Sequence, residues 1–281
     1  MDNKIVKTSI GIALCRYNNN NIEILLIKKR FSYHFYALVM GHYKKSDLKG
    51  NAKYIKFLFD NMNYAEKIDL LGMQFSTMWY RIWLNNPEKY FNISDVYQTT
   101  NFSNHVMHNT LSNSEIYKSY FQKRNKFENN FLKDNGKKLR SYIQSSTNSE
   151  IIWEIPKGHI HGNETHIDCA IREFYEETSI KYNKYRILHN IDPITDESYD
   201  GDIVYKSIYY VADLCDKDLT PRINFKNLDQ IVEVDQIKWV SINEIKFMNL
   251  NVDMHNKLVR LYGNIINKYK QVKKLKNISL A

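Results

Sequence analysis

The segment from Gly158 to Ile180, GHIHGNETHIDCAIREFYEETSI, constrains this chain more than any other. Its second half, Asp168 to Thr178, contains good helix formers and no Gly or Pro, so we expect a helix there. On that helix Glu173, Glu176 and Glu177 stand at positions i, i+3 and i+4, which puts three carboxylates on one face. Such like charges repel each other, and the usual remedy is a hard divalent cation such as Mg²⁺ or Mn²⁺. The pattern predicts either a metal-binding helix or a solvated acidic face.

The spacing around the glutamates favours the metal-binding alternative. Glu164 follows Gly158 after five residues, the run REFYEE from Arg172 to Glu177 follows after seven more, and Ile180 closes the segment. This pattern resembles the signature motif of the Nudix hydrolase family, the Nudix box. One position departs from it, because Ser179 stands where the family has a glycine. That glycine closes the helix at a positive φ, which a serine adopts only with modest strain or avoids with a different turn.

The resemblance implies an α+β fold, the Nudix α/β/α sandwich, in which the motif forms a loop, a helix and a second loop. Family members hydrolyse a nucleoside diphosphate linked to another group, and they use Mg²⁺ or Mn²⁺ ions. Carried over by position, the metal ligands would be Glu173, Glu176 and Glu177, completed by a backbone carbonyl near Gly158. Bound cations would neutralise the charge of the pyrophosphate and lower the pKa of the attacking water.

The resemblance also implies three catalytic residues. Glu177 belongs to the motif, and Arg172 would orient Glu173 while Glu164 supports Arg172. In many members a further acid outside the motif binds metal or acts as the base. Glu233, just before the last expected strand, is the residue we expect in that place, the alternative being an exposed loop glutamate.

The order of the expected elements predicts a core interrupted once. TSIGIALCR and IEILLIKKR, separated by an Asn run, indicate a β-hairpin. Residues 37–133 carry helix-length patterns and many aromatic residues, with thirteen Lys and Arg against eight Asp and Glu. We expect residues 1–36 and 134–281 to form a discontinuous Nudix hydrolase domain and residues 37–133 to form a helical insertion that binds RNA.

Several stretches spread over the chain sharpen the resemblance. They are KTSIGIALCR, FDNMNYAEK, MWYRIW, DNGKKL, WEIPKG and CAIREFYEET. They resemble the mRNA-decapping Nudix enzymes of large cytoplasmic DNA viruses, of the African swine fever virus type. In those enzymes the helical insertion binds RNA, and the reaction cleaves the cap triphosphate bridge to give 7-methyl-GDP and 5′-monophosphate RNA. The resemblance implies capped mRNA as partner, host shutoff as role and the host cell cytoplasm as location.

Basic residues supply the candidate RNA and phosphate contacts, because phosphate neutralisation dominates nucleic-acid affinity. The candidates are Lys157 beside the motif, Lys44, Lys45, Lys49, Lys53 and Lys56 early in the insertion, and Lys123, Arg124 and Lys126 near its end. Ordinary solubilising charge is the competing interpretation for each. Lysines of the C-terminal helix offer a second possible wall of the RNA groove. His159 and His161 are further loop candidates, and no aromatic residue stands out as the cap-stacking group.

Composition limits the alternatives. The net charge of +9 favours polyanionic partners without choosing among them. Three widely spaced cysteines fit neither a disulfide framework nor a zinc site, and no apolar run approaches the roughly 20 residues that span a bilayer. We expect a soluble intracellular protein that needs no membrane, and the oligomeric state stays open. Hydrolysis of diphosphoinositol or dinucleoside polyphosphates, and a catalytically silent RNA-binding module, are the alternative functions.

Overall fold

The computed structural model describes residues 5–18, 21–48, 52–82, 115–148, 152–200, 203–216, 218–248, 250 and 252–278. The chain divides into two compact units. We call Met1–Arg30 with Ile152–Ala281 the sheet unit, and Phe31–Ile151 the helical unit.

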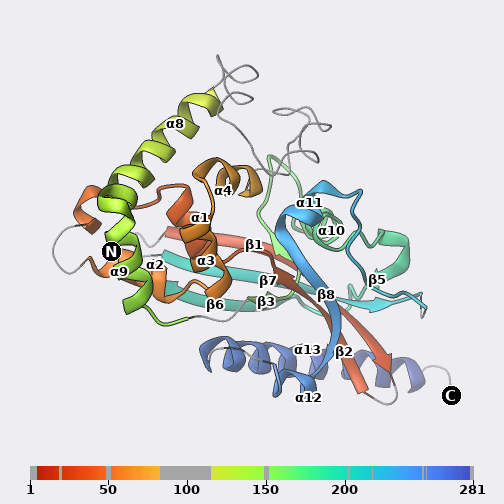
Figure 1. The fold of residues 1–281 in the computed structure, drawn as a ribbon. Helices are drawn as coiled ribbons and strands as arrows, with labels where there is room; N and C mark the ends of the chain where they lie inside the picture. The colour runs from red at the N-terminus through yellow and green to blue at the C-terminus, as the bar shows by residue number, and fades with distance from the viewer. Residues whose placement is uncertain are drawn as a thin grey trace. The chain divides into compact units, whose positions relative to one another are not determined.

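A mixed sheet forms the centre of the sheet unit (Figure 1). The expected hairpin is confirmed as β1 (Ile5–Asn18) and β2 (Asn21–Lys29), an antiparallel pair. β1 also pairs in parallel with β7 (Ile203–Leu214), and β2 pairs with β8 (Val234–Ser241). Among the described residues the strand order is β3-β2-β1-β7-β5, with β4 also on β1, β6 also on β7 and β8 also on β2.

The shorter strands join the sheet at its edges. The motif WEIPKG forms two short strands, β3 (Trp153–Glu154) and β4 (Lys157–Gly158). The break falls at Pro156, which has no N–H to give to a ladder. β5 (Tyr185–Ile187), preceded by the short helix η3 (Tyr182–Lys184), and β6 (Ile194–Asp200) both run antiparallel to β7.

Helices cover both faces of this sheet (Figure 1). The apolar side chains of β1 alternate: Ile12 and Leu14 pack with the helix α10 (His166–Thr178), whereas Ala13 and Cys15 pack with α13 (Val252–Ile278). Two hydrophobic layers therefore enclose the sheet, which is the α+β sandwich expected from the sequence. Two short helices, α11 (Leu228–Glu233) and α12 (Ile242–Ile245), flank β8.

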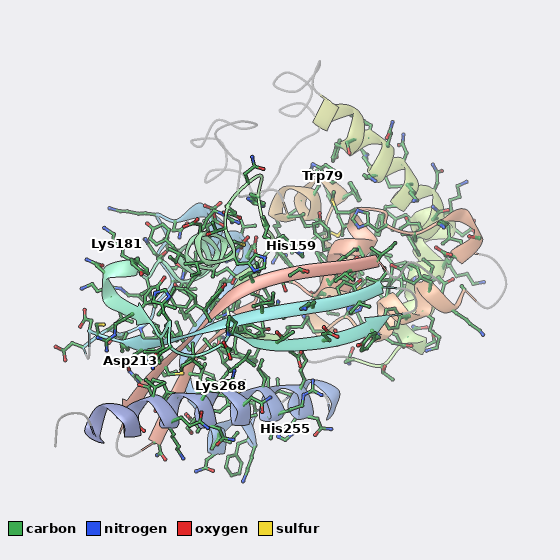
Figure 2. The ribbon with its side chains drawn as sticks, turned by 180° about the vertical axis from the view of Figure 1, so that it is seen from behind. Trp79, His159, Lys181, Asp213, His255 and Lys268 are labelled. Carbon is green, nitrogen blue, oxygen red and sulfur yellow. The ribbon has the colours of Figure 1, made fainter. Side chains whose placement is uncertain are left out.

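The C-terminal helix α13 lies on the face of the sheet opposite the acidic helix α10. Seen from behind, Lys268 and His255 lie along α13 below the sheet, and His159 lies above it (Figure 2). Lys268 donates to the carbonyl of Asp192, and Arg260 pairs with Asp196. The sheet separates α13 from α10, so the described lysines of α13, Lys257, Lys268 and Lys270, do not line the side of the sheet on which α10 lies.

The helical unit is built from short helices and one aromatic core. Its elements are α1 (Tyr33–Val39), η1 (Lys45–Leu48), α2 (Lys53–Asp60), α3 (Tyr64–Gly72), α4 (Phe75–Ile82), α8 (Glu115–Phe127), the π-helical turn η2 (Glu128–Leu132) and α9 (Lys133–Ser145). Buried rings such as Trp79, Phe59 and Phe131 form its core. Most of the aromatic residues that the structure describes in this unit therefore serve packing.

The helical unit is longer at both ends than the expected insertion of residues 37–133. α1 begins before residue 37, and Phe35 is buried in the core of the helical unit. α9 continues to Ser145, and its Leu139 is buried in the same core. Burial of these apolar side chains, rather than a change in composition, sets the boundaries. No helix among the described residues is long and apolar enough to cross a membrane.

Candidate active site

The acidic helix α10 begins and ends with identifiable caps. The side chain of Thr165 accepts a hydrogen bond from the backbone N–H of Asp168, which satisfies an N-terminal donor. The helix ends at Ser179, whose φ of 57° is left-handed. The expected helix is confirmed, and the serine takes the conformation that the family's glycine adopts without strain.

Arg172 ties three carboxylates of the motif together. Its Nε and Nη2 donate to the two oxygens of Glu164, at 3.0 and 2.6 Å. Its Nη1 donates to Glu173 Oε1 at 2.8 Å and to Glu176 Oε2 at 2.9 Å. The hydrogen bonds to Arg172 lower the pKa of Glu164 to about 2. The guanidinium fork therefore fixes two acids of the helix against an acid of the preceding loop.

Gly158 leaves the room that Glu173 occupies. A Cβ built on Gly158 would lie 2.0 Å from Cδ of Glu173, far inside contact distance. The Glu173 carboxylate therefore lies directly against the backbone of β4, and only glycine permits this approach.

Glu177 is the most buried acid of the group. Its side chain is 2% exposed, and burial raises its pKa to about 7 although Lys29 opposes the shift. Lys29 Nζ contacts one carboxylate oxygen at 2.5 Å, and the backbone N–H of Lys157 donates to the other at 2.7 Å. A neighbouring cation and a backbone donor thus hold this acid where its charge is costly.

Two further acids meet the same lysine. Glu233 Oε2 lies 2.9 Å from Lys29 Nζ, and Glu154 Oε1 lies 3.7 Å from it. Glu154 also accepts from Lys157 Nζ at 2.5 Å. Burial alone would lower the pKa of Lys157, but Glu154 raises it above its ordinary value. The ammonium of Lys157, expected to contact phosphate, is therefore engaged with Glu154 in this structure.

Side chains at α11 clamp the C-terminal end of the acidic helix. Asn227 Nδ2 donates to the carbonyl of Glu176 at 3.2 Å and to Ser179 Oγ at 2.8 Å. Gln230, which is fully buried, donates to the carbonyl of Glu177 at 3.2 Å. These bonds satisfy carbonyls that the last helical turn leaves without an intrahelical partner. They also join the helix that carries the motif to α11, which ends at Glu233.

The donor set suits a divalent cation. Its carboxylates are hard oxygen ligands, as Mg²⁺ and Mn²⁺ prefer, and the close approach at Gly158 brings Glu173 to a backbone segment that can add a carbonyl. Among the described residues no three His, Cys, Asp or Glu side chains converge as a ready cluster. Instead, Glu173 and Glu176 form ion pairs with Arg172, and Glu177 forms an ion pair with Lys29. The residues therefore fit a cation by chemistry, while two basic side chains now neutralise them.

The candidate RNA contacts in the helical unit fall into distinct groups. Lys44, Lys53 and Lys56 are exposed, and Lys56 also pairs with Asp60 at 2.9 Å. Lys44 lines an open hollow of about 620 Å³ with His42, Tyr43 and Tyr54 among its other residues. The side chain of Lys45 and the whole of Lys49 lie outside the described residues.

The later candidates, Lys123, Arg124 and Lys126, lie on α8 and are half-buried. Arg124 pairs with Glu128 at 2.8 Å. Lys126 Nζ donates to the carbonyls of Gly41 and Tyr43 at 2.6 and 2.5 Å. Arg124 and Lys126 thus hold parts of the helical unit together.

The loop histidines lie at the surface. His159 is exposed, and its Nδ1 lies 2.9 Å from the carbonyl of Thr8. His161 is also exposed, and its backbone N–H donates to Glu164 at 2.7 Å. The His161 backbone therefore helps to fix the acid that supports Arg172.

Sequence reasoning missed Lys29, Glu154 and Gln230. Lys29 had a usable signal: it follows Leu25 and Ile27 at two-residue steps, so it belongs to the strand face that packs on α10. Glu154 and Gln230 had no comparable signal, because their partners lie on other elements.

Comparison with known proteins places this site in a class. A family model described as NUDIX domain matches residues 134–262. Over 87% of its length the chain is 33% identical to a protein of African swine fever virus, of which 89% is covered. The chain belongs to the Nudix hydrolase family and is an enzyme of that family, whose members generally use divalent metal ions.

Two viral relatives that match most of this chain carry decapping names. The African swine fever virus protein is named mRNA-decapping protein g5R. A protein of Acanthamoeba polyphaga mimivirus named putative mRNA-decapping protein is 27% identical, with 95% of this chain and 72% of that protein covered. A solved C. elegans Ap4A hydrolase complex matches 92% of this chain and 97% of its own at 12% identity, with a TM-score of 0.40, too low to carry an argument.

Proposed function

We propose that this Nudix hydrolase is a divalent-metal-dependent mRNA-decapping enzyme. It cleaves the triphosphate bridge of the cap and releases 7-methyl-GDP and 5′-monophosphate RNA. The observation that carries the proposal is the extent of the similarity to the g5R decapping protein, which spans 87% of this chain and 89% of that protein. A shared hydrolase motif alone would cover a much shorter segment. The substrate is a capped mRNA, and the place of action is the cytoplasm of a host cell.

The acidic helix supplies the groups for this reaction. Glu173, Glu176, Glu177 and the backbone near Gly158 would hold Mg²⁺ or Mn²⁺, which supplies charge neutralisation for the phosphates and a more acidic water. Arg172 keeps two of these acids on one side of the helix. Protein groups thus fix the ligands before the substrate arrives, which lowers the reorganisation needed in the transition state.

Glu233 is the residue that we assign to proton transfer. Its side chain is about half exposed, at 51%, and it lies next to the Lys29 ammonium that also contacts Glu177. An exposed carboxylate can accept a proton from water and return it to solvent. The metal ligands are more buried and serve this purpose less well.

The RNA body would bind the candidate lysines early in the helical unit, of which Lys44, Lys53 and Lys56 are described and exposed. Their ammonium groups neutralise phosphates without reading sequence. Tyr54 and Phe57 lie on α2, the helix that also carries Lys53 and Lys56. Both rings are exposed, and they stack on each other with centroids 6.3 Å apart. Exposed rings beside lysines are the combination that single-stranded RNA uses.

The test uses RNA with a radiolabelled 7-methylguanosine cap, incubated with purified protein and Mn²⁺ or Mg²⁺. The wild type should release 7-methyl-GDP, and Glu177→Gln should abolish release while still binding the RNA. Glu197→Gln, which changes an exposed acid of β6, is the matched control and should stay active. Binding of RNA without release by the wild type would refute decapping and point to a diphosphoinositol or dinucleoside polyphosphate substrate.

A further inference from the structure

One ammonium group gathers three acids that are far apart in the sequence. Lys29 Nζ lies 2.5 Å from Glu177 on α10, 2.9 Å from Glu233 at the end of α11, and 3.7 Å from Glu154 on β3. These acids together raise the pKa of Lys29 well above its ordinary value, although burial alone would lower it. The ammonium therefore stays charged and acts as their shared counter-ion.

The backbone is arranged to give Lys29 this position. In the pairing of β2 with β8 the register shifts, so that Lys28 lies opposite Gln236 while Lys29 lies opposite Val234. Arg30 then donates its backbone N–H to the carbonyl of Glu233 at 2.8 Å. Irregularities of this kind re-aim side chains and are common beside active sites. The shift sets Glu233 beside Lys29, and the neighbouring Lys28 pairs with the skipped Asp235 instead.

We propose that Lys29 is a positioning residue that holds Glu177 and Glu233 together in the metal-free enzyme and competes with the divalent cation for Glu177. The proposal rests on the metal site of the proposed function. It adds to that function that a lysine of β2, outside the Nudix motif, sets part of the affinity for the cation.

The two basic side chains of the site, Arg172 and Lys29, differ in which carboxylate partners they would lose when a metal ion binds. Arg172 keeps a bidentate partner, Glu164, which is not among the proposed ligands, so it stays anchored when Glu173 and Glu176 bind metal. Lys29 shares its shortest contact with Glu177, a proposed ligand. A lysine is a point charge on a flexible stem and can withdraw from one partner while keeping another.

The energetic consequence has a definite sign. Without metal, Lys29 offsets the repulsion among Glu154, Glu177 and Glu233, so it stabilises the empty site. With metal, the same positive charge repels the incoming cation. Removing the charge should therefore destabilise the metal-free protein and tighten metal binding, whereas a purely structural lysine would change the stability alone.

The experiment measures the dissociation constant for Mn²⁺ from the electron paramagnetic resonance signal of free Mn²⁺. Lys29→Gln should bind Mn²⁺ tighter than wild type by about fivefold or more, the lower end of typical coupling between linked sites. Lys28→Gln is the matched control on the same strand and should match wild type. Lys29→Arg, which keeps the charge, should restore the wild-type constant, and Glu177→Gln should weaken binding.

The outcomes separate the two proposals. Mn²⁺ binding that is equal or weaker in Lys29→Gln, with wild type binding normally, overturns the role of Lys29 and leaves the proposed function standing. Wild type that binds no Mn²⁺ overturns both.

A second measurement uses wild type only and does not depend on how a variant folds. Lys29 is acetylated with acetic anhydride, with and without Mn²⁺, and read by peptide mass spectrometry. Acetylation of Lys29 relative to Lys28 should rise with Mn²⁺, and an unchanged ratio refutes the displacement.

Discussion

The hydroxyl of Ser179 donates to the side-chain carbonyl of Gln230, with 3.0 Å between the oxygens. Ser179 sits at a left-handed φ of 57°, where the Nudix motif has glycine. Its hydroxyl also accepts from Asn227 at 2.8 Å. Two hydrogen bonds thus offset the backbone strain of the serine and join the end of α10 to α11.

Two substitutions of Ser179 separate the effect of backbone strain on stability from the effect of its hydrogen bonds. Ser179→Ala keeps the strained φ and loses both bonds, so it should lower the free energy of unfolding by about 1–3 kcal/mol. Ser179→Gly loses the same bonds but relieves roughly 1 kcal/mol of strain, so it should cost less. Urea unfolding of both variants measures the difference. Equal losses would mean that the left-handed conformation stores no strain here.

Lowering the pH should remove the contribution of Glu164 to the stability of the fold. Its hydrogen bonds to Arg172 lower its pKa from 4.5 to about 2. A depressed acid stabilises the fold fully above its unfolded pKa and loses that contribution as the pH falls toward the folded pKa. The difference in melting temperature between wild type and Glu164→Gln, measured in EDTA, should therefore be largest near neutral pH and shrink between pH 4.5 and about 2. A constant difference over this interval would contradict the ion pair.

Gly158→Ala should disable the proposed metal site. The new Cβ would fall 2.0 Å from Glu173 Cδ, so the carboxylate or the strand has to move. Displacing a group that orients metal ligands typically costs about 10–100-fold in metal affinity or activity, and we expect a loss in that range. Gly263→Ala in α13 is the control, because a Cβ there meets nothing within 4 Å. Mn²⁺ titration of both variants measures the change in affinity. Wild-type affinity in Gly158→Ala would contradict the close approach of Glu173 to the backbone at Gly158.

The exposed lysines early in the helical unit should set the salt dependence of RNA binding. Changing Lys44, Lys53 and Lys56 to alanine should weaken binding and reduce the slope of log K against log salt by about 2, since single-stranded contacts contribute roughly 0.7 each. Fluorescence anisotropy with uncapped RNA at several salt concentrations measures the slope. Changing the exposed Lys133, Lys137 and Lys138 of α9 removes the same charge and is the control. Equal effects in both triple variants would mean that charge alone, and not the predicted surface, binds RNA.

Local pattern made much of the fold predictable. The hairpin, the acidic helix and the strand β8 follow from periodicity and turn residues over a few neighbours, and the structure confirms each. The unit boundaries did not follow, because burial of Phe35 and Leu139 in one core joins segments beyond the change in composition. Lys126 shows the same limit. Its charge suggested a contact with RNA, whereas the structure shows that it donates to two carbonyls of the segment between α1 and η1.

The sequence by itself determined the family, the cluster of glutamates on the acidic helix and their partnership with Arg172, because all of these lie within one helix and the loop before it. The spacing of a helix brings such residues together whatever the rest of the chain does. Only the tertiary structure decided that Lys29 reaches Glu177 and Glu233, and that Lys157 turns to Glu154. These contacts join β2, α10, α11 and β3, and the packing and register of separate elements, which no local spacing encodes, set their distances.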